Sequence, residues 1–306
     1  ICRFKNCFII YIIFFAIFGL YYYILMNLFE RARFFRTKKR LGQNFLVNPD
    51  VIEEIIDYAQ ITKDDTIIEI GPGVGFVTEQ LVKYAKKVIA IELDEEAIKE
   101  LEKLECDNLE IIHNDILKTD ISTLSNEKVK VVANIPYYIT APIISHLLGE
   151  IDDLNNKNRN SISEIILMVQ EEVARRMVAT EKSPSKQYGL LTILAQFWTD
   201  CEIIRLVGRK SFFPAPKVNS ALVGLKINNE PKLKLSDYSH FRRVLKAAFS
   251  QRRKNIKNCL VNNGFNKDIV KSVLNKLDID ENTRGESLSI EKFGQLSEEL
   301  KNANQN

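Results

Sequence analysis

The sequence contains few cysteines and histidines, the residues that form disulfides and most zinc sites. Its 306 residues include five cysteines, at Cys2, Cys7, Cys106, Cys201 and Cys259, and three histidines. The cysteines are odd in number and none forms a Cys-x-x-Cys pair, which argues against a disulfide framework and a zinc site. The scattered histidines do not have the spacing of metal ligands. We therefore expect reduced thiols in a cytosolic protein without a bound metal.

A strong excess of charge is also missing, because the formal net charge is +3. Total charge therefore says little about partners, but its distribution says more. Six basic residues and no acidic residue occur between Arg31 and Arg40, and eight basic residues and no acidic residue occur between Tyr238 and Lys267. Two separated basic runs indicate contacts with a polyanion. For a single run, a solvated helix face is the alternative.

Long hydrophobic runs are missing except at the start, where Phe8 to Met26 is long enough for a membrane helix. A membrane anchor is one interpretation. A signal peptide is another, although no small-residue cleavage site follows. We favour a third, a start-site artefact with translation beginning at Met26, because the run is nearly all Ile, Phe and Tyr, as translated AT-rich DNA would be. Residues 1–30 are then a doubtful segment, and the protein is expected in the cytoplasm.

The next part of the chain is typical of an open α/β fold. The buried strand Thr66–Ile70 leads into a glycine turn with Gly71, Gly73 and Gly75, and a helix is expected from Phe76 to Tyr84. The glycines allow the backbone to approach a ligand closely. Their Gly-x-Gly-x-Gly spacing differs from the Gly-x-Gly-x-x-Gly of dinucleotide-binding proteins.

Three more strands are expected, and each ends in a polar residue. Lys87–Glu92 ends in Glu92, which is placed to chelate two ribose hydroxyls. Leu109–His113 precedes Asp115, which is placed to accept from an adenine amino group. Val129–Ala133 precedes Asn134. Ligands bind at the carboxyl edge of parallel strands, so we expect these side chains and the glycine turn to line one site.

The stretch Asn134-Ile135-Pro136-Tyr137 carries the predicted chemistry. The Asn134 side-chain oxygen and the Ile135 carbonyl can each accept a hydrogen from a planar substrate's exocyclic amine. Pro136 fixes the turn and has no competing N–H, and Tyr137 offers a face for stacking. The alternative is a helix-initiating turn with Asn134 as its cap.

Downstream segments close the sheet and then become helical. Before the sheet, a helix is expected over Val51–Ala59. Further strands are expected over 203–207 and 221–227, a linker over 228–231, and helices over 238–249, 256–262, 267–277 and 290–300. We therefore divide the chain into a large α/β domain at 31–230 and a helical domain at 231–306.

Several motifs carry a family resemblance. Glu69–Gly73 and Asn134–Tyr137 together resemble S-adenosylmethionine-dependent amino-methyltransferases, and the basic stretch Lys39–Leu46 is similar to that of ribosomal RNA adenine dimethyltransferases acting on the small subunit. The resemblance runs from about Arg36 to the end of the chain. Further matching segments are Met168–Ala174 after the catalytic loop, Phe212–Ser220, and Ala248–Lys254, which matches a C-terminal helix of the family.

The resemblance implies a Rossmann-like class I methyltransferase sheet with a small all-helical C-terminal domain. It implies dimethylation of N6 of two adjacent adenines in the 3′-terminal hairpin of 16S rRNA, within the small ribosomal subunit or its precursor, during ribosome biogenesis. The cofactor is S-adenosylmethionine, and a monomer without metal is expected. The implied cofactor contacts are Asn44, Leu46, Gly71, Gly73, Glu92, Asp115 and Asn134. The implied catalytic residues are Asn134, Ile135, Pro136, Tyr137 and Phe212. The implied RNA contacts are Lys38, Lys39, Arg40, Arg252, Arg253 and Lys254.

Alternatives remain open at this point. Phe212 either stacks on the base opposite Tyr137 or is an ordinary core aromatic. The large-subunit 23S rRNA adenine methylase of macrolide resistance shares the Asn-x-Pro-Tyr motif. A non-catalytic RNA-binding assembly factor is a further possibility. A nicotinamide oxidoreductase is disfavoured by the glycine spacing.

Overall fold

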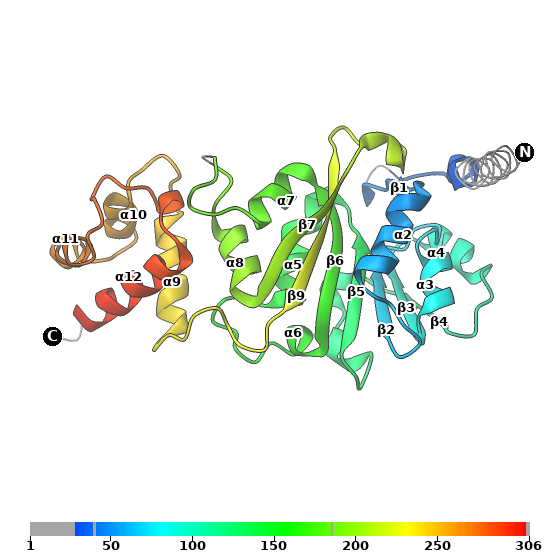
Figure 1. The fold of residues 1–306 in the computed structure, drawn as a ribbon, viewed down its shortest axis with the longest axis horizontal. Coiled ribbons are helices and arrows are strands. Elements are labelled where there is room, and N and C mark those ends of the chain that lie inside the picture. Colours follow the sequence, from blue (N-terminus) through cyan, green and yellow to red (C-terminus); the bar gives the residue numbers. More distant parts are fainter. Residues whose placement is uncertain (1–27, 39–40, 185, 304–306) are drawn as a thin grey trace, which may run out of the picture.

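The computed structural model describes residues 28–38, 41–184 and 186–303. The apolar run Phe8–Met26 therefore lies outside the described residues. The centre of the molecule is a seven-stranded sheet with strand order β4-β3-β2-β5-β6-β9-β7 (Figure 1). The strands are β2 (Thr66–Ile70), β3 (Lys87–Glu92), β4 (Leu109–His113), β5 (Val129–Asn134), β6 (Ile162–Gln170), β7 (Thr199–Val207) and β9 (Ser220–Ile227).

The first five strands of the sheet are parallel, and β9 runs antiparallel to both β6 and β7. All five residues of β2 are buried, because helices cover both faces of a parallel sheet. Successive side chains point to opposite faces, so Ile68 joins one hydrophobic cluster and Ile67 joins the other. The run of apolar residues in this strand is explained by burial on two sides.

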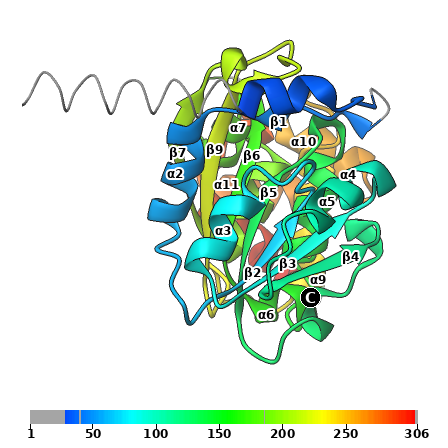
Figure 2. The same cartoon turned by 90° about the vertical axis from the view of Figure 1, so that its right-hand side faces the viewer.

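Helices form the outer layers. The cluster on one face includes residues of α2 (Pro49–Tyr58) and α3 (Thr78–Tyr84), and the cluster on the other includes α5 (Thr140–Leu148), α7 (Glu171–Met177) and α8 (Leu190–Trp198). Figure 2 shows α2 and α5 on opposite sides of the sheet. The remaining helices of this part are α4 (Glu95–Glu102) and the short α6 (Lys157–Ser161).

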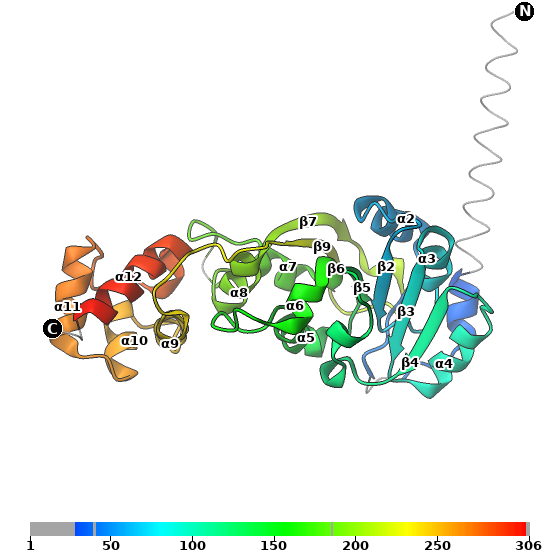
Figure 3. The same ribbon diagram turned by 90° about the horizontal axis from the view of Figure 1, so that it is seen from below.

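Four further helices form a cluster at the end of the molecule beside α8 (Figure 3). They are α9 (Tyr238–Ala248), α10 (Ile256–Asn262), α11 (Lys267–Lys276) and α12 (Ile290–Ala303). The expected fold class, a Rossmann-like sheet with a helical C-terminal region, is confirmed. One detail differs from expectation. The family resemblance places Ala248–Lys254 on a helix, but α9 ends at Ala248, and residues 249–254 form a turn before α10, close to the helix bounds of 238–249 and 256–262 expected from the sequence pattern.

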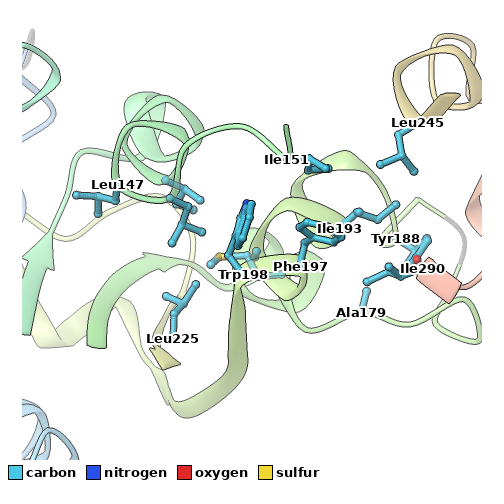
Figure 4. Packing of buried hydrophobic residues seen from close by; sticks show 14 of the residues in the cluster. Leu147, Ile151, Ala179, Tyr188, Ile193, Phe197, Trp198, Leu225, Leu245 and Ile290 are labelled. Carbon is cyan, nitrogen blue, oxygen red and sulfur yellow. The ribbon is translucent and has the colours of Figure 1, made fainter. Parts of the chain in front are cut away.

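Aromatic side chains join the helical cluster to the sheet. The Phe197 ring of α8 lies 5.7 Å from that of Phe241 in α9 and 5.1 Å from that of Trp198. Figure 4 shows Phe197 beside Trp198. Arg242 adds an ion pair with Glu150, at 2.8 Å between Nε and Oε2. The two parts therefore share one continuous hydrophobic cluster.

The N-terminal part adds a small second sheet that the sequence did not predict. β1 (Phe45–Leu46) pairs antiparallel with β8 (Phe212–Phe213), with Leu46 opposite Phe212. In Figures 1 and 2, β1 lies above the sheet, at the end where α7 follows β6. This is the carboxyl edge of the parallel strands. Within the described parts of the chain, every helix is too short or too polar to cross a membrane.

Candidate active site

A cavity opens at the carboxyl edge of the parallel strands, between the segment over residues 41–46, the glycine turn and the strand ends. We call residues 41–46 the arm. The cavity brings together ten residues predicted from the sequence. These are Asn44, Leu46, Gly71, Gly73, Glu92, Asp115, Asn134, Ile135, Pro136 and Tyr137.

The glycine turn after β2 is held open for a ligand. Gly71 and Gly73 have φ of +67° and +58°, a region that favours glycine. A Cβ on Gly73 would lie 2.7 Å from Cε1 of Phe45, so the aromatic ring of the arm packs directly on the turn. The conformation and the contact both require glycine here.

Glu92 holds this turn in place. Its carboxylate accepts hydrogen bonds from three backbone N–H groups, those of Gly73 at 3.0 Å, Leu93 at 2.8 Å and Asp94 at 2.9 Å. Burial raises the pKa of Glu92, while the three N–H donors act in the opposite direction. Sequence reasoning expected contacts with a ribose and did not foresee that Glu92 also fixes the glycine turn.

Glu69 lies in β2 beneath the cavity and is 3 % exposed. Burial raises the pKa of its carboxyl to about 8, although the Thr78 hydroxyl donates to Oε2 at 2.6 Å and the neighbouring Glu92 raises the pKa further. Glu69 is therefore largely protonated at neutral pH. The sequence analysis named Glu69 only as the first residue of the Glu69–Gly73 motif.

Asn134 is oriented by the arm. Its Nδ2 donates to the Asn44 carbonyl at 2.9 Å, which assigns the orientation of the side-chain amide. Among the described residues, no hydrogen bond reaches Oδ1 of Asn134 or the carbonyl of Ile135, so both acceptors are available to a ligand. The short helix that begins at Tyr137 has no side-chain cap, which removes the capping role considered for Asn134.

The aromatic residues that line the cavity are not the pair that the resemblance implied. The Tyr137 ring lines the cavity, and its hydroxyl lies 2.5 Å from Oγ of Ser220. Phe212 is 2 % exposed, belongs to a hydrophobic core cluster and does not line the cavity. Tyr138, which the sequence did not single out, lines the mouth of the cavity with 63 % of its surface exposed.

The basic residues predicted to bind RNA fall into different environments. Arg252, Arg253 and Lys254 are exposed on the turn after α9. Lys38 is instead paired with Asp94, at 2.5 Å between Nζ and Oδ1. Lys39 and Arg40 lie outside the described residues.

Two members of the C-terminal basic run, between Tyr238 and Lys267, also form ion pairs within the protein. Arg242 pairs with Glu150, and Lys257 pairs with Glu281. The basic surface is consequently smaller than the sequence suggested.

Fold and site together define a class. A sheet in this order, with a glycine turn after β2, an acid at the end of β3 and an amide at the end of β5, is that of a Rossmann-like methyltransferase. The chain belongs to the ribosomal RNA adenine dimethylase family, whose model matches residues 34–302.

Two similar proteins support the assignment of this chain to the family. The chain is 43% identical over 270 residues to the Ribosomal RNA small subunit methyltransferase A of Clostridium acetobutylicum, covering 87% of this chain and 94% of the relative. The enzyme of the same name from Bacillus licheniformis is 43% identical over 279 residues, covering 87% and 92%.

Two solved structures are similar over most of the chain. One is a dimethyladenosine transferase from Plasmodium falciparum, with a TM-score of 0.68, 29% identity and coverage of 84% of this chain and 97% of that one. The other is the 23S rRNA methyltransferase ErmE, with a TM-score of 0.64, 26% identity and coverage of 84% and 100%.

Proposed function

We propose that this protein transfers methyl groups from S-adenosylmethionine to N6 of two adjacent adenines in the 3′-terminal hairpin of 16S rRNA. The observation that carries the proposal is the geometry of Asn134. Its Nδ2 is occupied by the Asn44 carbonyl, so its Oδ1 is presented to the cavity as an acceptor. An acceptor pair made of Oδ1 and the Ile135 carbonyl matches the two hydrogens of an adenine amino group.

The reaction needs the amine to become nucleophilic. The N6 lone pair is delocalised into the adenine ring, and hydrogen bonds to Asn134 and Ile135 favour its pyramidal form. When bound, S-adenosylmethionine would supply an activated methyl group, and Asn134 and Ile135 would hold the N6 lone pair toward it. The new nitrogen–carbon bond would form as the carbon–sulfur bond breaks, with S-adenosylhomocysteine as the second product. The methylated nitrogen then loses a proton to solvent. The two acceptors strengthen as positive charge develops on nitrogen, so they stabilise the transition state more than the substrate.

The cofactor would occupy the part of the cavity between the arm and the strand ends. Glu92 would accept from ribose hydroxyls, Asp115 from the adenine amino group, and Gly71 and Gly73 would let the backbone approach. Asn44 and Leu46 would cover the cofactor from the arm. These residues bind and orient, while the cofactor supplies the activated methyl group.

The target adenine must leave its base stack to reach the cavity. Tyr137 would stack on one face of the extruded base. Because Phe212 is buried against β1, we assign no second stacking face to it in this arrangement. Phosphate contacts would come from the exposed Arg252, Arg253 and Lys254 of the helical domain at 231–306, and the enzyme would act as a monomer.

Substrate choice is supported by the relatives, which are named small subunit methyltransferases and are 43% identical to this chain. The test is to offer labelled S-adenosylmethionine with undermethylated small subunits and, separately, with large subunits. We expect label in two adjacent adenines of small-subunit rRNA. Label in 23S rRNA would assign the protein to the large-subunit methylases, and cofactor binding without methyl transfer would assign it to the assembly factors.

A further inference from the structure

A polar cluster beside the cavity joins the arm to the turn after β3. The carboxylate of Asp94 is its centre, and the Asp94 side chain has no exposed surface. Lys38 Nζ donates to Oδ1 at 2.5 Å and Gln43 Nε2 donates to Oδ2 at 2.7 Å. Gln43 also accepts from the Lys38 backbone N–H at 2.7 Å. Each of the three residues therefore contacts both of the others.

Asp94 remains charged in this cluster. Burial would raise its pKa, but the hydrogen bonds from Lys38 and Gln43 bring the pKa of Asp94 below its ordinary value. Charge-assisted hydrogen bonds to a buried carboxylate are stronger than neutral ones, and removing one partner leaves the other unpaired. The Asp94 carboxylate is buried, while the Lys38 side chain is 28 % exposed, so the cluster joins the arm to a buried charge at the edge of the surface.

The arm is fixed at two points in the described structure. At its carboxyl end, Phe45 and Leu46 pair with β8, and the Val47 N–H donates to the Ser211 carbonyl at 2.8 Å. At its other end, Gln43 is held by Asp94. Asn44 lies between these points, and its carbonyl is the acceptor that orients Asn134.

We propose that Asp94, through Lys38 and Gln43, is a positioning residue that fixes the arm so that the Asn44 carbonyl holds the Asn134 amide in its catalytic orientation. This inference rests on the proposed function. It assigns to Lys38 a role in building the cofactor and base site, in place of a contact with RNA.

The same turn serves both the cofactor and the arm. Glu92 and Asp94 are two residues apart, and the Asp94 N–H donates to Glu92 Oε1 at 2.9 Å. Glu92 lines the cavity, while Asp94 points its carboxylate at the arm. A change at Asp94 is thus expected to reach cofactor binding through the arm and amine alignment through Asn134.

The test uses the full chain with Gln43→Glu, which places a second carboxylate against Asp94, and with Asp94→Asn, which keeps an N-cap for α4. Glu96→Gln is the matched control, because Glu96 lies 3.6 Å from Lys38 and is exposed. The measurements are S-adenosylhomocysteine affinity without RNA, kcat at saturating S-adenosylmethionine on undermethylated small subunits, and hydrogen exchange of residues 44–47.

We expect Gln43→Glu to weaken cofactor binding by about tenfold to a hundredfold, to lower kcat at saturating cofactor as well, and to speed exchange in the arm. Asp94→Asn should have a smaller effect in the same direction, Lys38→Arg should keep most of the wild-type kcat, and Glu96→Gln should match wild type. A purely structural role would change thermal stability but leave kcat intact in the folded, saturated enzyme, and that result would overturn the inference.

The outcome is separable from that of the proposed function. If wild type binds S-adenosylhomocysteine and methylates small subunits, but Gln43→Glu has wild-type affinity and kcat, the positioning role is wrong and the proposed function stands. If wild type itself does not methylate small subunits, the proposed function is wrong, whatever the variants do.

Discussion

Replacing Glu69 by Gln should change how stability depends on pH. Burial raises the pKa of Glu69 to about 8 in the folded protein, whereas a glutamate in an unfolded chain titrates near its ordinary value of about 4.3. Between these two values the folded state binds more protons than the unfolded state. Stability from this group is therefore fully present below pH 4 and is lost as pH rises toward 8.

The size of the effect follows from the two pKa values. Between pH 5 and pH 8, wild type should lose about 3.5 kcal/mol more unfolding free energy than Glu69→Gln, because glutamine does not ionise. Glutamine keeps the shape of the side chain and still accepts from the Thr78 hydroxyl. The variant should fold normally, and its unfolding free energy should rise relative to that of wild type as pH increases.

Urea titration at several pH values would measure this difference. Trp198, the single tryptophan of the chain, is buried at the junction of the sheet and the helical cluster and reports on unfolding. Wild type and Glu69→Gln should give similar slopes with urea but midpoints that diverge as pH rises. Parallel midpoints across the range would refute the reasoning, because they would mean that Glu69 is already ionised in the folded protein.

Two further predictions concern the glycine turn and the RNA surface. Gly73→Ala should weaken cofactor binding by roughly tenfold, because a Cβ would lie 2.7 Å from Phe45 Cε1 and alanine costs roughly 1–2 kcal/mol at this left-handed φ. The control in the same calorimetric titration is Gly208→Ala, whose Cβ would have no atom within 4 Å. Equal affinity of the two variants for the cofactor would contradict the assignment of the turn. Arg252→Ala should weaken rRNA binding and reduce the slope of log affinity against log salt by about 1, measured by filter binding at several salt concentrations; an unchanged slope would remove Arg252 from the phosphate contacts.

Local patterns predicted most of the sheet. The apolar runs at 66–70 and 87–92 form β2 and β3, and the helix over Ile256–Asn262 has the bounds expected. These elements carry their signal in consecutive residues. A strand that is buried on both faces is a continuous apolar run, and a helix that is buried on one face has apolar residues at a regular spacing. Strand ends are set by the same pattern, so the positions of Glu92 and Asn134 at one edge also followed from the sequence.

Contacts between distant segments could not be predicted in this way. Lys38 is 56 residues from Asp94, and a basic residue in a basic run gave no sign of an internal partner. The pairing of Leu46 with Phe212 is a two-residue ladder, too short to have a periodic signal, and it explains why Phe212 is in the core. The hydrogen bond from Asn134 to Asn44 is likewise a product of the tertiary fold.

The most direct test of the central claim is the single-turnover rate of methyl transfer by Asn134→Ala, measured on undermethylated small subunits at a cofactor concentration shown to saturate the variant. We expect the variant still to bind S-adenosylhomocysteine and to transfer methyl groups at a rate lower by roughly 10²–10³ or more, because one preorganised acceptor for N6 is lost. A rate close to that of wild type would contradict the role assigned to Asn134 and, with it, the mechanism proposed for this site.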